Sequence, residues 1–275
     1  MVGLDKKIIA LLSDFGTKDG YVAAMKGVIL EICNTVKIVD ITHDIVRQDV
    51  RNGAFVLATA APYFPDGTIF ICVVDPGVGT ERRGIVVEGK RNFYIGPDNG
   101  LLMLSVQREG MKYVYEITNK KYMKEEISLT FHGRDIFAPV GAYLVKGIRP
   151  EEIGKEIFDY IVLSQERATI KDQKIFGEVL HVDGFGNIIT NITFEDLKQI
   201  GIDFDIVLDI QIKDQAYKIY FSETYGKVRP SEFLALIGSN GFFEIAINQG
   251  NAALKLDISS GDSITISKSY SNTNF

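Results

Sequence analysis

Apolar runs of strand length alternate with stretches of helix length through the first 165 or so residues, and this alternation constrains the fold more than any other feature. Residues 7–12, which are all apolar from residue 8 onward, precede a polar turn, as expected of a fully buried strand. Residues 21–33 place apolar side chains on one face of a helix. Further strands are expected at 36–41, 68–74, 85–87 and 93–95, and further helices at 51–61, 101–107 and 136–145. This alternation predicts a mostly parallel α/β sheet.

The pattern changes beyond about residue 165, where short apolar runs are separated by Gly, Asn, Asp or Ser. These runs lie at 176–182, 188–192, 206–212, 216–221, 234–237, 243–247 and 254–258. Their spacing predicts a small antiparallel β domain, either a barrel or a sandwich. A short helix at 193–200, capped by Thr193, interrupts the series. We therefore expect an α/β domain over residues 1–168 and a β domain over residues 169–275.

Composition narrows the class of protein. Of the 275 residues, 46% are hydrophobic and 24% charged, which excludes disorder and allows one large or two modest domains. The net charge of −6, without a block of Lys or Arg, argues against a nucleic-acid partner. The longest aliphatic run, 69–74, is strand-sized and no secretion signal is evident, so we expect a cytoplasmic protein without a membrane partner. Cys33 and Cys72 lie in apolar runs and are expected to be buried free thiols.

Two polar turns follow predicted parallel strands, at the edge of the sheet where ligands bind in such folds. The turn at 13–17 contains Asp14, whose carboxylate could accept hydrogen bonds from a ribose diol or could cap the next helix. The segment 75–83 has glycines but neither the Lys-Ser/Thr pair of a phosphate loop nor a following helix. It leaves a loop with one carboxylate, Asp75, and two guanidiniums, either of which could be a solvated surface charge.

Several other segments admit both a structural and a functional interpretation. Residues 96–100 form a turn by composition, in which Asn99 would serve as a helix cap. His132 has glycine and charged neighbours and precedes an apolar helix, although a bare histidine is most often structural. The segments 183–187 and 238–241 fit either glycine-rich bends or ligand-binding loops. The three histidines belong to no zinc-binding motif.

Five motifs occur in one order along the chain: Ser-Asp-Phe-Gly-Thr (13–17), Val-Asp-Pro-Gly-Val-Gly-Thr followed by Arg82, Gly-Pro-Asp-Asn-Gly-Leu-Leu (96–102), Phe-His-Gly-Arg-Asp-Ile-Phe-Ala-Pro (131–139), and Asp-Gly-Phe-Gly-Asn with Thr-Asn-Ile (183–192). Together they resemble the S-adenosylmethionine hydroxide adenosyltransferases, which are adenosine-forming hydrolases related to bacterial fluorinase and chlorinase. The resemblance spans about residues 7–258. It implies an N-terminal α/β domain, a smaller C-terminal β-barrel, and homotrimers whose sites lie between one subunit's N-terminal domain and its neighbour's barrel.

The resemblance also implies a reaction. In this family water, as hydroxide, attacks the ribose C5′ of S-adenosyl-L-methionine, which yields adenosine and L-methionine, and no metal or cofactor is implied. The residues that match the water-activating set are Asp75, Arg82 and His132, and the seven-residue offset from Asp75 selects Arg82 over Arg83. Asp75 would orient the water or His132, Arg82 would stabilise hydroxide character, and His132 would be the base.

Six further positions match substrate-binding residues of the family. Asp14 matches the residue that holds the ribose hydroxyls. Asn187 matches a contact to adenosine, and Asp183 matches the carboxylate that faces the methionine amino group. Candidates for the methionine end and the adenine edge are Ser239, Glu244 and Ala252. Asn240 stands where the halogenases carry Arg, which puts a guanidinium clamp on the methionine carboxylate in doubt.

We therefore expect an S-adenosylmethionine hydrolase, and three other interpretations stay open. The chain could be a halogenating relative, although Arg82 and His132 argue against the apolar halide pocket that a halogenase needs. It could be a non-catalytic module that binds S-adenosylmethionine or adenosine. It could also be a metal-dependent hydrolase with Asp14, Asp75 and His132 as ligands.

Overall fold

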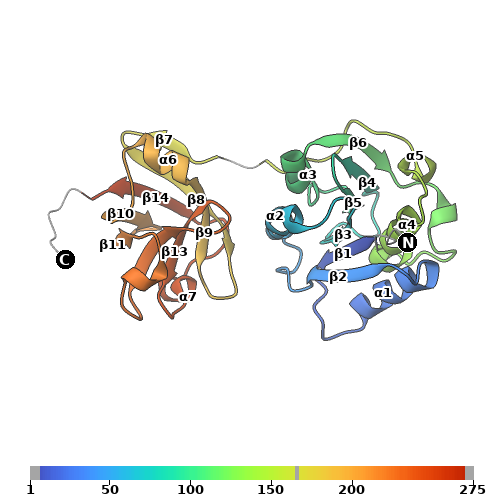
Figure 1. Ribbon diagram of the computed structural model, residues 1–275, viewed down its shortest axis with the longest axis horizontal. Helices are drawn as coiled ribbons and strands as arrows, with labels where there is room; N and C mark the ends of the chain where they lie inside the picture. The colour runs from blue at the N-terminus through green and yellow to red at the C-terminus, as the bar shows by residue number, and fades with distance from the viewer. Residues whose placement is uncertain (1–6, 165–166, 270–275) are drawn as a thin grey trace, which may run out of the picture. The chain divides into compact units, whose positions relative to one another are not determined.

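The computed structural model describes residues 7–164 and 167–269, and the chain divides into two compact units, Met1–Ser164 and Gln165–Phe275 (Figure 1). Each unit has its own buried apolar core. The boundary expected after residue 168 stays a prediction, because residues 165–166 lie outside the described part of the chain. Within the described residues, no helix is long and apolar enough to cross a membrane.

The N-terminal unit contains a six-stranded sheet in the order β2-β1-β3-β5-β4-β6. Its strands are β1 (Ile8–Ser13), β2 (Lys37–Thr42), β3 (Ile69–Val73), β4 (Gly84–Gly89), β5 (Phe93–Pro97) and β6 (Met111–Glu116). Neighbours β2, β1, β3 and β5 run parallel, whereas β4 is antiparallel to both β5 and β6. The mostly parallel sheet is confirmed, and β4 is reversed because residues 90–92 are too short a connection for a crossover.

Helices cover both faces of this sheet (Figure 1). They are α1 (Tyr21–Ile32), α2 (Val50–Ala60), α3 (Met103–Glu109), α4 (Ala138–Val145) and the short α5 (Pro150–Ile153). On the face of α1 and α4, strand β1 buries Ile9 and Leu11. On the face of α2 and α3 it buries Ala10 and Leu12. Alternate side chains of a strand point to opposite faces, so a strand covered on both faces is continuously apolar.

The C-terminal unit contains a closed β-barrel. Its strands are β7 (Thr169–Lys171), β8 (Lys174–Val182), β9 (Ile188–Thr193), β10 (Ile206–Ile212), β11 (Gln215–Phe221), β12 (Phe233–Ile237), β13 (Phe242–Ile247) and β14 (Ser263–Lys268). The order is β14-β10-β11-β12-β13-β9-β8-β7, and a further pairing of β14 with β8 closes the ring and leaves β7 as an appended strand. Neighbouring strands are antiparallel except β11 and β12, which are parallel. The expected antiparallel barrel is confirmed, apart from that one pair.

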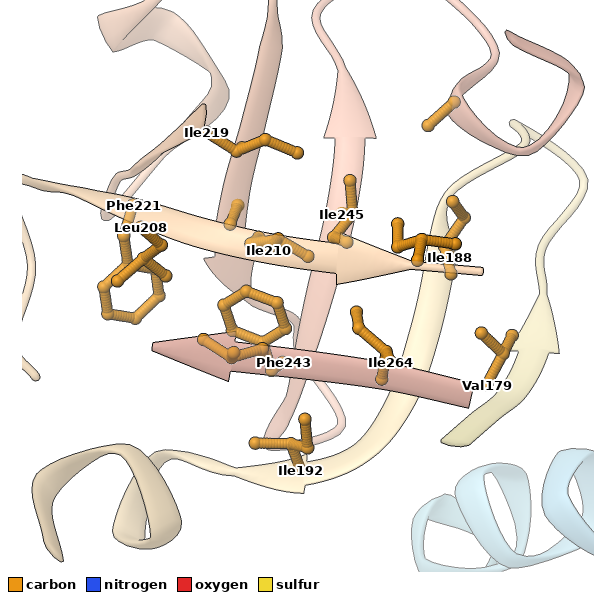
Figure 2. Packing of buried hydrophobic residues seen from close by; sticks show 14 of the residues in the cluster. Val179, Ile188, Ile192, Leu208, Ile210, Ile219, Phe221, Phe243, Ile245 and Ile264 are labelled. Carbon is orange, nitrogen blue, oxygen red and sulfur yellow. The ribbon is translucent and has the colours of Figure 1, made fainter. Parts of the chain in front are cut away.

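Apolar side chains fill the barrel, as Figure 2 shows. Ile188, Leu208, Ile245 and Ile264 come from four different strands and are all buried. Since a small barrel packed in this way leaves little room for a ligand inside it, binding groups are expected on the connecting loops.

The strand expected at 254–258 is wrong. Those residues belong largely to helix α7 (Ala252–Leu256), which Asn251 starts by accepting a hydrogen bond from the Leu254 N–H at 2.7 Å. The cap outweighs the alternating apolar residues that suggested a strand. The other helix of this unit, α6 (Phe194–Gln199), is confirmed, with Thr193 as its cap.

Three strands, β6, β7 and β14, are not predicted by the sequence patterns. Strand β14 alternates isoleucine with small polar residues and completes the barrel between β10 and β8. The helix expected at 136–145 is preceded by a π-helical turn, Gly133–Phe137, which leads into α4. Both cysteines are free; Cys72 is buried as expected, but Cys33 is only half-buried.

Candidate active site

Asp75, Arg82 and His132 form one hydrogen-bonded group just beyond the end of strand β3. Arg82 donates Nε–H to Asp75 Oδ1 at 3.0 Å, and its Nη2 donates to Asp75 Oδ2. The same Nη2 lies 3.0 Å from His132 Nδ1, while Nη1 donates to the carbonyl of Arg83 at 3.1 Å. Arg82 therefore contacts both other residues expected to activate water, and the catalytic role of the three stays a prediction.

The guanidinium and carboxylate of this group are shielded from water. The side chains of Arg82 and Asp75 are 9% and 5% exposed. The guanidinium carbon also lies 5.5 Å from the ring centroid of Phe137. A two-point contact between guanidinium and carboxylate fixes the orientation of both groups, and a buried pair of this kind leaves an unpaired charge if either partner is removed.

The contact with Arg82 fixes the protonation state of His132. Because a guanidinium has only donors, Nδ1 must accept, and a neutral ring then carries its proton on Nε2. Burial lowers the pKa of His132, the positive charge of Arg82 lowers it further, and Asp75 and Asp135 act in the opposite direction. The imidazole is therefore neutral near pH 7, with Nε2–H as its remaining donor.

One glycine brings the loop after β3 close to the segment that carries His132. Gly79 has a positive φ of 77°, and a Cβ built on it would lie 2.3 Å from the carbonyl oxygen of Leu129. No other residue could occupy this position without displacing the backbone next to His132. The glycine at position 79 thus serves the close approach of two chain segments.

A cavity of about 200 Å³ opens beside the Asp75 group. Asp75, His132 and Asp14 all line it, together with the aromatic side chains of Phe15 and Phe131. The centroids of these two rings lie 5.8 Å apart in an edge-on contact. The cavity therefore combines two carboxylates and an imidazole with an apolar wall.

Asp14 is a cavity residue and not a helix cap. Helix α1 begins at Tyr21 behind Gly20, which makes no side-chain capping bond, so the capping alternative is wrong. Asp14 Oδ2 accepts the backbone N–H of Gln48 at 2.9 Å. Gln48 and its neighbour Arg47 line the same cavity. No sequence pattern indicates these two residues, because their loop meets the first turn only in the tertiary fold.

Arg83 and the motif residue Asn99 hold neighbouring chain segments in place. Arg83 forms ion pairs with Asp98 at 2.7 Å and with Asp159 at 2.8 Å. The second guanidinium of the 75–83 segment therefore has a structural role. Asn99 donates its side-chain amide to the carbonyl of Val74 at 2.9 Å. This bond ties the 96–100 turn to the end of β3, so the motif supports the loop that carries Asp75.

A second polar group lies on the barrel, around the loop between β8 and β9. Asp183 accepts the backbone N–H and the side-chain amide of Asn187, each at 2.9 Å. The Tyr225 hydroxyl lies 3.4 Å from that amide nitrogen and donates to Glu244 Oε1 at 2.6 Å. Three of the expected binding residues thus lie together, and Tyr225 joins them without any motif that could have indicated it.

The barrel group concentrates negative charge. Glu244 is only 7% exposed, and burial raises its pKa; the hydrogen bond from Tyr225 counteracts this, and the charge of Asp183 adds to it. Burial, followed by the contact with Glu244, also raises the pKa of Tyr225. Two carboxylates in this setting favour a ligand group that carries positive charge.

Ser239 and Ala252 lie on segments that border this group. Ser239 is exposed in the loop between β12 and β13. Its neighbour Gly238 approaches Glu244, since a Cβ built there would lie 2.5 Å from Oε2. Ala252 is fully buried as the first residue of α7, and the N–H of the next residue, Ala253, donates to the carbonyl of Gly186 at 2.9 Å. Helix α7 therefore supports the 183–187 loop.

The residues suggested as metal ligands do not form a metal site. Asp14, Asp75 and His132 line one cavity. Nevertheless, no group of three or more His, Cys, Asp or Glu in the described part of the chain is arranged to hold a metal ion. The metal-dependent alternative therefore has no ligand set among residues 7–164 and 167–269.

Comparison with known families decides the relationship. The N-terminal unit matches the SAM hydroxide adenosyltransferase N-terminal domain over residues 9–154, and the barrel unit matches the corresponding C-terminal domain over residues 177–265. The chain belongs to this family. The resemblance carried by the five motifs is confirmed, and the match extends over both units.

Relatives of this SAM hydroxide adenosyltransferase family member include a (R)-S-adenosyl-L-methionine hydrolase from Methanocaldococcus jannaschii, 39% identical, with 94% of this chain and 95% of the relative covered. A fluorinase from Nocardia brasiliensis is more distant, 28% identical with 95% and 97% covered. Among solved structures, an uncharacterized conserved protein from Thermotoga maritima has a TM-score of 0.90 and 39% identity, with 94% and 100% covered.

Proposed function

We propose that this protein hydrolyses S-adenosyl-L-methionine to adenosine and L-methionine. The observation that carries the proposal is the shielded Asp75–Arg82–His132 group at a cavity that also contains Asp14. The name of the Methanocaldococcus relative, a (R)-S-adenosyl-L-methionine hydrolase, supports the same substrate and suggests a preference for the R configuration at sulfur.

The proposed reaction requires an activated and oriented nucleophile more than it requires help for the leaving group. The oxygen of water forms a bond to C5′, the C5′–S bond breaks, and its electron pair returns to sulfur, which leaves as a neutral thioether. No acid is needed at the leaving group. Water must lose a proton and approach in line with the C5′–S bond, and such orientation is worth up to ~7–11 kcal/mol in well-ordered cases.

His132 is the proposed proton acceptor, held by Arg82. Its lowered pKa keeps the ring neutral, so a lone pair is available near pH 7. In the resting site that lone pair, on Nδ1, accepts from Arg82 Nη2. Proton transfer to Nδ1 therefore requires Arg82 to shift its Nη2 contact from the ring to the developing hydroxide, while Asp75 keeps the guanidinium in place.

Substrate binding is proposed to use both units. The cavity of about 200 Å³ is smaller than the ~300–1,000 Å³ of typical small-molecule sites, so it would hold the ribose and the sulfonium but not the whole substrate. Asp14 would bind the ribose hydroxyls. Asp183 Oδ2 accepts one bond inside the protein and would accept another from the methionine ammonium. Asn187, Ser239, Glu244 and Ala252 would complete the pocket.

We also propose a homotrimer in which the barrel group of one subunit meets the cavity of another, and a cytoplasmic location. Light scattering tests the assembly, and cell fractionation tests the location.

Incubation with S-adenosylmethionine followed by chromatography tests the reaction. We expect adenosine and methionine in equal amounts, with ¹⁸O from labelled water in the adenosine 5′-hydroxyl. Formation of 5′-halo-adenosine when fluoride or chloride is added would indicate a halogenase. Tight binding in calorimetry without turnover would indicate a binding module.

A further inference from the structure

A chain of polar contacts runs from strand β2 to the turn at the end of strand β1. His43 Nε2 lies 3.1 Å from Asp40 Oδ1, and His43 Nδ1 lies 2.7 Å from Ser13 Oγ. Ser13 Oγ also accepts the backbone N–H of Phe15 at 3.3 Å. Ser13 and His43 are buried, with 1% and 3% exposure. Asp40 is anchored at its outer end by Lys26 of helix α1 at 2.6 Å.

We propose that His43, with Ser13 and Asp40, positions the carboxylate of Asp14 for the ribose of the substrate. This inference rests on the proposed function, since it takes Asp14 to be the residue that holds the ribose diol. None of the three lines the cavity, so they are positioning residues and not catalytic ones.

The backbone around His43 is joined to the same turn. The Gly16 N–H donates to the carbonyl of His43 at 2.7 Å, and the Ile45 N–H donates to the carbonyl of Ser13 at 3.4 Å. The Gln48 N–H then reaches Asp14 Oδ2 at 2.9 Å. The loop after β2 and the turn after β1 are thus held together on both sides of Asp14, with the imidazole of His43 inside that junction.

The contacts also assign the donors. A lone pair on His43 Nε2 would face a carboxylate oxygen, so the proton belongs on Nε2, although the contact is not aligned as a well-directed hydrogen bond. In the neutral ring with its proton on Nε2, Nδ1 accepts and Ser13 donates its hydroxyl to it. Ser13 Oγ is left to accept from Phe15, so the two bonds fix the hydroxyl in one orientation.

A Ser–His–Asp chain invites comparison with hydrolase triads, and the geometry favours a positioning role. A nucleophilic serine must reach the substrate. Ser13 is buried, accepts a backbone N–H with the oxygen that would attack, and does not line the cavity. The chain therefore constrains the turn instead of attacking a substrate.

A double-mutant cycle tests the coupling. Asp14→Ala removes the diol contact and is expected to raise KM for S-adenosylmethionine more than it lowers kcat. His43→Ala should raise KM about tenfold with a smaller change in kcat, within the range of coupling seen between residues of one hydrogen-bond network. In the double variant KM should be no higher than in Asp14→Ala alone, because without the carboxylate there is nothing left to position.

A second variant covers the case in which His43→Ala does not fold. In His43→Asn the amide oxygen lies close to the former Nδ1 and can still accept from Ser13, so KM should return toward the wild-type value. Val145→Ala serves as the matched control, because Val145 is buried at the far end of the sheet, where its carbonyl accepts from Lys7 at 2.8 Å. It should lower the melting temperature and leave KM unchanged.

Amide hydrogen exchange gives a readout that needs no substrate. In His43→Ala, or His43→Asn to a smaller degree, exchange should speed up at Gly16 and Ile45, whose N–H groups join the turn to the loop, and not across the whole unit. Multiplicative KM effects in the double variant, or exchange that rises uniformly as in Val145→Ala, would overturn the positioning role. Absence of hydrolysis in the wild type, with the local exchange effect intact, would count against the proposed function alone.

Discussion

Arg82 makes two contacts, with Asp75 and His132, that together keep a neutral base in the site. Its guanidinium holds Asp75 with two hydrogen bonds and donates from Nη2 to His132 Nδ1. The first contact keeps the arginine in place, since neither charge is easily removed from a shielded pair. Burial lowers the pKa of His132 and the charge of Arg82 in this second contact lowers it further, so the base stays unprotonated near neutral pH.

Replacement of His132 by alanine should lower kcat by about 10²–10⁴-fold, the usual contribution of a general base. Substrate affinity, measured as Kd with the variant, should change little, because the proposed role of His132 is to take a proton from water and not to bind the sulfonium. Single-turnover kinetics and calorimetry check the two effects separately. A nearly normal kcat would move the activation of water to Asp75 and Arg82.

The pH profile should show the lowered pKa of His132. If the neutral ring is the base, kcat/KM rises with pH as His132 loses its proton and levels off above that point. The midpoint should lie below the ordinary histidine value of about 6.5, because burial and Arg82 both disfavour the charged ring. Arg82→Gln removes a positive charge and should raise the His132 pKa. NMR titration of the His132 ring measures its pKa in the wild type and in Arg82→Gln, and it does so even if the variant is inactive. A midpoint above 6.5 in the wild type would contradict this account.

At the scale of elements, loops at the carboxyl ends of strands bring the cavity together. Asp14 follows β1, Asp75 follows β3, and His132 precedes the π-helical turn into α4. The first two could be placed from sequence, because parallel strands end at one edge of a sheet. The last could not, since its proximity to Asp75 depends on how residues 129–132 pass over the loop at Gly79.

Gly79→Ala tests that close approach. The added Cβ combines a strained positive φ with a clash against the carbonyl of Leu129, so it should destabilise the protein by more than the ~1–3 kcal/mol of strain alone and should lower kcat by displacing His132. Gly67→Ala is the matched control, with a φ of 83° but no atom within 4 Å of the added Cβ. It should cost about 1 kcal/mol and leave kcat unchanged. Thermal unfolding and kcat are measured for both variants. Equal effects of the two substitutions would contradict a role for the close approach at Gly79.

At the scale of the whole molecule, the expected binding residues are divided between two units. The Asp75 group belongs to Met1–Ser164, and the Asp183–Glu244 group belongs to Gln165–Phe275. Each group is organised by its own unit, and in the proposed function neither group alone would contact all parts of S-adenosyl-L-methionine.

Mixing of two inactive variants tests whether the units complement each other between subunits. His132→Ala removes the base from the N-terminal unit, and Asp183→Ala removes a carboxylate from the barrel. If sites form between subunits of a trimer, unfolding and refolding the two together should restore about a quarter of wild-type activity by random assembly. Either variant refolded alone is the control. Activity that stays at the level of the single variants in a mixed trimer would place each site within one chain.

The two-part architecture could be predicted from the sequence, because strand periodicity and glycine-rich turns are local properties of the chain and the five motifs keep one order along it. The sequence also placed Asp14, Asp75, Arg82, Asp183 and Asn187 on turns. Only the tertiary structure decided three other features, which the local patterns do not show. Asn251 turned an alternating segment into helix α7, and Tyr225, distant in sequence, reached Glu244. The protonation state of His132 likewise follows from burial beside Arg82, which depends on how distant segments pack.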